Sequence, residues 1–307
     1  MPPDSSPYPL SRSHLSTTRL IAQHTLWQLD LRFLIHPTII DSFSSSESFR
    51  NSLDTIASPA NPQPSIVPPT NPYSQSLSYR IADLATGTAI WPLSLLHQYP
   101  NARITASDIS LSQIPFREWL PPGLEVREWD IYTSIPNHWV EYFDVVHIRL
   151  ALLAVKSNDT HTVLRNAWEM LRPGGWMQWD ELDPEGAITV FPKGTSVEGE
   201  DVRRFHRMQE LTDFARLKWV RGLEQAFEDV GFESVQRAEF QGQMSTVGFF
   251  QSLQFLVMEE EVERKEEEAK ERVGKDVEWG VQMSEKGFAR VVPKVVIWGQ
   301  KPLEDVR

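Results

Sequence analysis

The chain has 307 residues, of which 40% are hydrophobic and 23% charged, so it can form a folded core and is not an intrinsically disordered chain. It has no cysteine, which excludes disulfides, thiolate metal sites and cysteine nucleophiles. Its 30 Lys and Arg against 42 Asp and Glu give a net charge of -12, which disfavours binding to the phosphates of nucleic acids.

The N-terminal residues lack the basic start and the apolar stretch of a secretory signal. No run of about 18 apolar residues predicts a membrane span. We therefore expect a cytoplasmic protein whose partners are neither membranes nor nucleic acids.

Two segments of different composition precede the regular part of the chain. Apolar residues at spacings of three and four predict a helix over residues 13–36, which Pro37 ends. We expect residues 1–41 to form an N-terminal helical cap segment. Residues 42–78 are rich in Ser and Pro and bury too little apolar surface to offset the entropy of ordering, so we expect a flexible insert.

Strands and helices alternate from residue 79 onward. Strands are predicted at 79–84, 103–107, 124–129, 143–148 and 175–180, and helices at 90–98 and about 159–171. This alternation predicts βαβ units, and hence a parallel sheet with helices on both faces.

The second half of the chain is less regular. It is predicted to contain a helix at 220–230, strands at 232–240 and 290–298, and a helical excursion at 246–272. We expect residues 79–307 to form one α/β domain with a Rossmann-like, seven-stranded, mostly parallel sheet, whose last strand is antiparallel, and with helical cap insertions at 184–219 and 246–289.

Residues 259–272 contain eight Glu and four Lys or Arg, with Glu260/Arg264, Glu261/Lys265, Glu266/Lys270 and Glu268/Arg272 at the i,i+4 spacing. An acidic partner-binding tail is one interpretation. A solvated helix with weak intrahelical ion pairs is the favoured one.

The chemistry is concentrated at the ends of the first three predicted strands. Asp83 to Ala89 is a turn of small residues between a strand and a helix, where the backbone can approach a ligand and the helix offers unpaired N–H groups. Asp108 and Asp130 end the second and third strands. Because the carboxyl ends of parallel strands share one edge of the sheet, these carboxylates are expected to line one crevice, although each one alone is equally well explained as a turn or cap residue.

The ligand is expected to be a nucleoside with a positive centre. A dinucleotide would require the G-x-G-x-x-G spacing, which is absent, and three carboxylates would repel a polyphosphate. S-adenosylmethionine has a ribose, an adenine amino group and a sulfonium cation, all of which suit carboxylates.

These motifs carry a family resemblance. The stretches that match are residues 81–88, Asp108-Ile109-Ser110, Glu118-Trp119-Leu120-Pro121-Pro122, Trp129-Asp130-Ile131, residues 142–150 and Leu171-Arg172-Pro173-Gly174-Gly175-Trp176. The chain resembles class I S-adenosylmethionine-dependent methyltransferases, and within them the fungal secondary-metabolism group that includes the gliotoxin-pathway N-methyltransferase. Residues 19–24 and 299–302 match the ends of the same group.

The resemblance implies that the cofactor is held by residues from four segments: Gln23 on the N-terminal helix, Asp83, Ala85 and Gly87 in the first turn, Asp108 after the second strand, and Trp129, Asp130 and Ile131 after the third. In this assignment the first turn cradles the methionine part, Asp108 binds the ribose and Asp130 binds the adenine amino group. The helix that carries Gln23 and His24 closes over the cofactor.

The resemblance also places His147 and Arg149, at the end of the fourth strand, beside the methyl-transfer site. Methyl transfer depends mainly on aligning donor and acceptor, and an oxygen or nitrogen acceptor can also need a base. His147 is the first candidate and Asp180 and Glu181 come next. A structural histidine and a solvated acidic loop are the alternatives, and no metal site is predicted.

Ala89 departs from the family pattern, which commonly has glycine there, and alanine disfavours a positive φ. The sequence therefore predicts a transferase that methylates O or N of a small, hydrophobic or aromatic natural product in secondary metabolite biosynthesis. The alternatives are a non-methylating reaction on the same fold, or a regulatory methyltransferase-like protein that acts through protein partners.

Overall fold

The computed structural model describes residues 11–43, 79–155, 159–209, 218–263 and 266–303. The predicted flexible insert at 42–78 lies outside the described residues except for its first two positions. None of the helices in the described part of the chain is long and apolar enough to cross a membrane. A cytoplasmic location stays a prediction.

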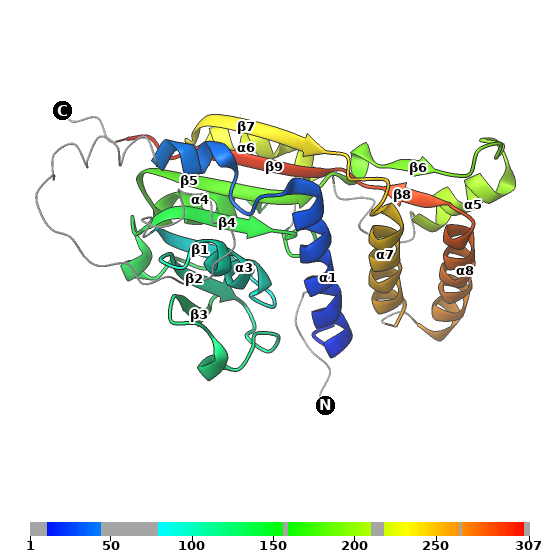
Figure 1. Ribbon diagram of the computed structural model, residues 1–307, viewed down its shortest axis with the longest axis horizontal. Helices are drawn as coiled ribbons and strands as arrows, with labels where there is room; N and C mark the ends of the chain where they lie inside the picture. Colours follow the sequence, from blue (N-terminus) through cyan, green and yellow to red (C-terminus); the bar gives the residue numbers. More distant parts are fainter. Residues whose placement is uncertain (1–10, 44–78, 156–158, 210–217, 264–265, 304–307) are drawn as a thin grey trace, which may run out of the picture.

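A seven-stranded sheet forms the centre of the molecule (Figure 1). Its strands are β1 (Arg80–Leu84), β2 (Arg103–Asp108), β3 (Leu124–Glu128), β4 (Phe143–Arg149), β5 (Leu171–Leu182), β7 (Glu233–Phe240) and β9 (Lys294–Gln300). They lie in the order β3-β2-β1-β4-β5-β9-β7, and the first five are parallel. β9 is antiparallel to both of its neighbours. The predicted Rossmann-like sheet with an antiparallel last strand is confirmed.

The prediction of one strand at 290–298 is wrong in one respect, because this segment forms two strands that belong to two different sheets. Pro293 has no N–H to donate to a ladder and separates β8 (Ala289–Val291) from β9. β8 pairs with β6 (Ile188–Val190) in a small antiparallel ribbon that continues beyond the main sheet (Figure 1).

Helices cover both faces of the sheet, which buries nearly all of β4. The helices of the sheet region are α1 (His14–Leu31), α3 (Ile90–Gln98), α4 (Thr160–Met170) and α6 (Leu223–Val230). The short 3-10 turns are η1 (Arg117–Trp119), η2 (Asn137–Trp139), η3 (Pro184–Gly186) and η5 (Trp219–Gly222). Trp91 of α3 stacks on His147, which fixes the face that α3 covers. Trp219 of η5 packs on Trp179 of β5. Trp179 follows the residue that pairs with His147, and because side chains alternate along a strand, it points to the face of the sheet opposite His147.

The N-terminal helix is shorter than predicted. It ends at Leu31, where Arg32 takes a left-handed φ of 65° and donates its N–H to the carbonyl of Gln28. Residues 37–43 are helical again, so Pro37 begins a helix instead of ending one. Proline suits a first helical turn, because its φ is already helical and its missing N–H has no partner there.

A second hydrophobic cluster lies beside the sheet, in a cap built from α5 (Glu200–Gln209), α7 (Val247–Val262) and α8 (Glu267–Glu285). Phe205, Met258 and Val277, one from each helix, are buried in it. Figure 1 shows α1, α7 and α8 side by side at one end of the sheet.

The Glu-rich segment pairs differently from the prediction. Glu260 bonds to Arg19 of α1 at 3.0 Å, and Lys270 pairs with Glu263 at 2.6 Å instead of with Glu266. The residues of α7 that face α1 therefore connect two elements of the fold and are not simply solvated. Arg264 and Lys265, the partners expected for Glu260 and Glu261, lie outside the described residues.

Candidate active site

A cavity of about 340 Å³ opens at the carboxyl ends of β1 to β4, with α1 as one wall. We call it the cofactor cavity. Most of the predicted site residues line it: Asp83, Ala85, Gly87, Asp108, Trp129, Asp130, Ile131 and Arg149. They come from four strand ends that parallel pairing brings to one edge of the sheet.

The first turn has an unusual backbone. Ala85, Gly87 and Ala89 have φ values of 51°, 58° and 57°, all in the left-handed region that favours glycine. The chain therefore forms at Ala89 the turn that glycine usually supplies. The hydroxyl of Thr86 donates to Oδ2 of Asp83 at 2.5 Å, which fixes the turn to the end of β1.

Asp108 lies opposite this turn. Its Oδ2 accepts the N–H of Gly87 at 2.8 Å and its Oδ1 accepts the N–H of Ser110 at 3.1 Å. Burial raises the pKa of Asp108, and the two N–H groups oppose this rise without cancelling it. Asp130 accepts the N–H of Tyr132 at 3.0 Å and faces the same cavity.

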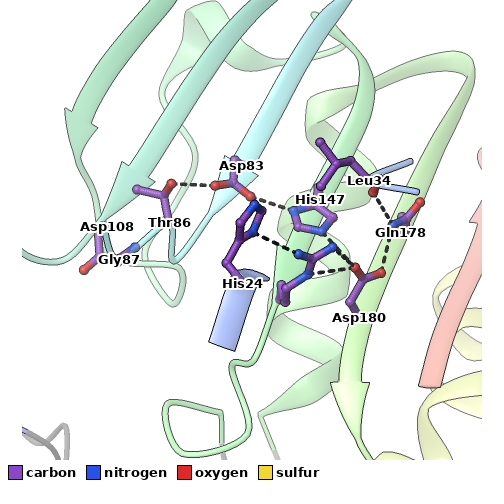
Figure 2. A network of polar contacts seen from close by, with 10 residues as sticks. His24, Leu34, Asp83, Thr86, Gly87, Asp108, His147, Gln178 and Asp180 are labelled. Atoms are coloured by element: carbon purple, nitrogen blue, oxygen red, sulfur yellow. Dashed lines mark hydrogen bonds and ion pairs between the residues drawn. The ribbon is translucent and has the colours of Figure 1, made fainter. Parts of the chain in front are cut away.

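Below the cavity, a buried polar network crosses the sheet from β1 to β5 (Figure 2). Nδ1 of His147 lies 2.6 Å from Oδ1 of Asp83, and Nε2 lies 3.4 Å from Oδ2 of Asp180. Arg149 donates to the same oxygen of Asp180 at 2.9 and 2.5 Å. Gln178 donates to the other oxygen of Asp180 at 2.8 Å. Both ring nitrogens of His147 thus face carboxylates.

His24 of α1 closes this network from above. Its Nδ1 lies 3.4 Å from Arg149, and since a guanidinium only donates, Nδ1 is the acceptor and Nε2 donates to the hydroxyl of Ser94 at 2.9 Å. Burial, Arg149 and His147 together lower the pKa of His24 to about 3. Burial opposes ionisation of Asp180, but Arg149 and His147 outweigh it and hold the pKa of that carboxyl below its usual range.

Three predicted site residues lie elsewhere than expected. His147 is fully buried beneath the floor of the cavity and not at its border. Asp180 is also fully buried and is paired with Arg149. Gln23 faces away from the cofactor cavity, because it is one position before His24 on the helix, and it lines a second, smaller cavity.

The acidic segment after the fifth predicted strand is buried rather than solvated. Asp180, Glu181 and Asp183 are 0%, 0% and 2% exposed, because β5 continues to Leu182. Burial raises the pKa of Glu181 to about 8. Among the described residues, no group of three His, Asp or Glu side chains is arranged to hold a metal ion.

Residues 81–175 match the family described as "Methyltransferase domain". The matched segment runs from β1 into β5 and includes every strand that borders the cofactor cavity. It is a class I methyltransferase domain.

Curated relatives of the methyltransferase domain come from fungi. The chain is 32% identical over 142 residues to "Methyltransferase grgD" of a Penicillium species, a match that covers 44% of this chain and 50% of that protein. It is 32% identical over 118 residues to "Methyltransferase str2" of Strobilurus tenacellus, covering 38% of this chain and 41% of that one. It is 25% identical over 170 residues to "Secondary metabolism regulator LAE1" of Hypocrea atroviridis, covering 48% of each. The chain thus matches about half the length of these relatives.

S-adenosylmethionine is the cofactor of class I methyltransferase domains, and the residues of this cavity fit it. Each oxygen of Asp108 accepts one N–H from the described residues, which leaves lone pairs for a ribose. The hydroxyl of Thr88 and the indole N–H of Trp91 are buried on the cavity wall without a partner in the described part of the chain. An amino-acid carboxylate is the kind of group that takes such donors.

Trp91 and Tyr132 were missed by the sequence analysis, and Thr88 was predicted only as part of the first turn, although all three line the cofactor cavity. Thr88 and Trp91 flank the start of α3. Their position at the start of a helix that follows the first strand could have predicted that they line the cavity. Tyr132 donates its hydroxyl to the carbonyl of Ala154 at 3.0 Å, a contact between distant segments that sequence spacing does not reveal.

Proposed function

We propose that this chain is an S-adenosylmethionine-dependent methyltransferase that transfers a methyl group to an oxygen or nitrogen of a small natural product in fungal secondary metabolism. The observation that carries the proposal is the cofactor cavity, in which Asp108 and Asp130 face a turn at the start of a helix within a methyltransferase domain. The name of one of these relatives, "Secondary metabolism regulator LAE1", supports the metabolic context.

In the proposed binding mode, each part of the cofactor lies beside the end of a different strand. Asp108 accepts hydrogen bonds from the ribose, and Asp130 accepts from the adenine amino group, with Trp129 and Ile131 along the ring. The turn at Ala85 and Gly87 lies along the methionine part, whose carboxylate takes the unpartnered donors of Thr88 and Trp91. Carboxylates on this cavity also favour a sulfonium cation.

The bound cofactor supplies a methyl group that is already activated by the sulfonium, so the protein contributes alignment and exclusion of water. Arg149 is held by two bonds to Asp180 and presents its remaining nitrogen to the cavity beside His24. In this geometry it orients an acceptor that carries a lone pair or a negative charge. Asp83 and Asp180 hold His147 from both sides, which supports a positioning role for this residue.

The histidine that faces the cavity is a poor candidate for a general base. His24 has a pKa of about 3, which makes its imidazole a weak base. Acceptors that need no proton removed by this histidine, such as a neutral amine or an acidic hydroxyl that is ionised in solution, fit this geometry.

Calorimetric titration with S-adenosylmethionine and S-adenosylhomocysteine tests the proposal. We expect both to bind the wild type, and Asp108→Ala to weaken binding at least about tenfold, because a charge-assisted contact to the ribose is lost. Asp201→Ala, which removes an exposed aspartate of α5, is the matched control and leaves the affinity unchanged. Since the pKa of Asp108 is raised, affinity falls on acidification from a higher pH than an ordinary aspartate would give.

Two outcomes count against the proposal. If neither compound binds, S-adenosylmethionine is not the cofactor of this chain. Binding without transfer of labelled methyl to any of a panel of phenols, amines and carboxylic acids favours the non-methylating alternative, since that protein keeps the cavity but not the reaction.

A further inference from the structure

A second cavity of about 30 Å³ lies on the other side of α1 from the cofactor cavity. It is bordered by α1, α5, α7, β8 and the end of β5. Three glutamines line it: Gln23, Gln209 and Gln254. We call it the glutamine cavity. Leu20 and His24 of α1 line the cofactor cavity, so one helix forms a wall of both.

Two of these glutamines have polar atoms without a partner. Nε2 of Gln209 and Oε1 of Gln254 are buried and make no hydrogen bond to any described residue. Gln209 is only 4% exposed. A buried amide without a partner opposes folding, and native structures contain few of them. The remaining wall is largely apolar, with Phe250 and Val257 from α7. A leucine in place of Gln209 or Gln254 would therefore fill the same space, so packing alone does not require an amide there.

The polar contacts around the cavity hold Gln209 in place without using its side-chain nitrogen. The guanidinium of Arg290 donates to the carbonyl of Gln209 at 3.5 Å and to that of Pro184 at 3.1 Å. The backbone N–H of Arg290 donates to the side chain of Gln251 at 2.7 Å. Among the described residues, no carboxylate lines the cavity.

We propose that the glutamine cavity binds a neutral amide group of a small ligand. An amide has a carbonyl that can accept a hydrogen bond from Nε2 of Gln209 and an N–H that can donate to Oε1 of Gln254, so one neutral group completes both unpartnered atoms. The volume of the cavity suits a single functional group, so the rest of the ligand lies outside it. The proposal does not depend on the proposed methyltransferase function.

Titration with acetamide tests this subsite directly, with acetone as the matched compound of nearly the same shape that lacks the N–H. Met258 lines the cavity, so the full-length protein is labelled with ¹³C-methyl methionine and its methyl signal is followed, assigned by Met258→Leu. Met170, buried in α4, serves as the internal reference. We expect acetamide to shift Met258 with saturation, and acetone to bind about tenfold more weakly, as the loss of one hydrogen bond predicts.

Gln209→Leu and Gln254→Leu are expected to reduce acetamide affinity about tenfold each. Both should fold, because leucine replaces an unpartnered buried amide, and their unfolding midpoints in urea are expected to equal or exceed that of the wild type. Gln282→Leu, at an exposed glutamine of α8, is the control and leaves the titration unchanged.

The proposal is overturned if acetamide does not move Met258, if acetone moves it equally, or if both leucine variants bind like the wild type. The first of these results would mean that the cavity holds water only. Because this titration needs neither cofactor nor turnover, it can succeed where the cofactor titration fails, and the two hypotheses fail separately.

Discussion

The two cavities on either side of α1 differ in how their polar side chains are partnered. In the cofactor cavity and the network beneath it, Asp83, Asp108 and Asp180 each contact two or more polar groups. In the glutamine cavity, Gln209 and Gln254 each leave an atom without a partner in the described part of the chain. The first site has its carboxylates partnered by the fold and leaves the neutral donors of Thr88 and Trp91 open, whereas the second offers an unpartnered amide donor and an unpartnered amide acceptor.

The two regions meet at α1, which long-range contacts hold in place. Asp30 pairs with Lys294 of β9 at 2.5 Å, and Arg19 pairs with Glu260 of α7 at 3.0 Å. α1 is therefore attached to the sheet by one ion pair and to the cap by the other. Changes at these contacts are expected to disturb both cavities, and changes within one region are expected to disturb only that region.

The largest expected effect is at the buried pair, whose side chains are 3% and 2% exposed. Lys294→Met removes the cation and leaves the carboxylate of Asp30 buried, with the hydroxyl of Thr246 at 3.2 Å as its remaining side-chain partner. We expect the free energy of unfolding in urea to fall by about 3–5 kcal/mol, as for other buried pairs that lose one partner. Cofactor and acetamide affinities are expected to fall together.

Lys275→Met is the matched control, because Lys275 and its partner Glu271 are both exposed. Its expected effect on unfolding is within about 0.5 kcal/mol. Equal losses in the two variants would mean that the buried pair does not anchor α1.

A smaller effect is expected at Glu181, which belongs to the sheet region alone. Its pKa is raised by burial from 4.5 to about 8, so the folded protein keeps a proton there that the unfolded chain releases above pH 4.5. The stability from this group is complete below pH 4.5 and is lost as the pH rises to 8. Glu181→Gln keeps the neutral shape at every pH. Relative to the wild type we expect it to be equally stable at the acid end and increasingly more stable as the pH rises, by about 2 kcal/mol at about pH 6.

Urea unfolding at several pH values measures this difference. Glu228→Gln, at an exposed position of α6, is expected to show no such trend. A Glu181→Gln variant whose advantage does not grow with pH would indicate that Glu181 is ionised in the folded protein. Cofactor binding at neutral pH is expected to be unchanged, since Glu181 is not among the residues that line that cavity.

The same division between regions explains how far the sequence could be interpreted. Strands β1 to β4 and helix α3 follow local apolar patterns, so their positions were predicted within one or two residues, and parallel pairing then brings Asp83, Asp108 and Asp130 to one edge. Residues in the cap are positioned by partners more than 200 residues away, as for Arg19 and Glu260. No local pattern encodes such contacts.

The side chains of individual site residues were harder to predict than the strands. Spacing placed His147 at the end of β4, but its burial depends on Trp91 stacking over it and on carboxylates from two other strands. Gln23 and His24 are neighbours in sequence, yet they face different cavities because successive residues of a helix point about 100° apart. The family resemblance assigned Gln23 to the cofactor, but the phase of α1 turns it toward the glutamine cavity.

The smallest expected effect concerns Ala89. It has a φ of 57° and is fully buried, and it does not line the cofactor cavity. Ala89→Gly relieves a left-handed backbone that costs an L-residue about 1–2 kcal/mol, but it gives up a buried methyl group worth about 0.8 kcal/mol and loosens the unfolded chain. These contributions nearly cancel, so we expect the free energy of unfolding to change by less than about 1 kcal/mol and cofactor affinity by less than about twofold.

Gly87→Ala is the informative counterpart, because Gly87 has nearly the same φ but lines the cavity. Among the described residues, a methyl group there would meet only Leu20, at 3.5 Å, so its cost to folding is backbone strain. The same methyl group would protrude toward the ligand and weaken cofactor binding. If Ala89→Gly instead tightens binding tenfold or more, the alanine does impair the site, and a non-methylating activity becomes the better hypothesis. If only Gly87→Ala changes the affinity, glycine is needed at position 87, where the backbone meets the ligand. Alanine at position 89 is then compatible with both the turn and cofactor binding.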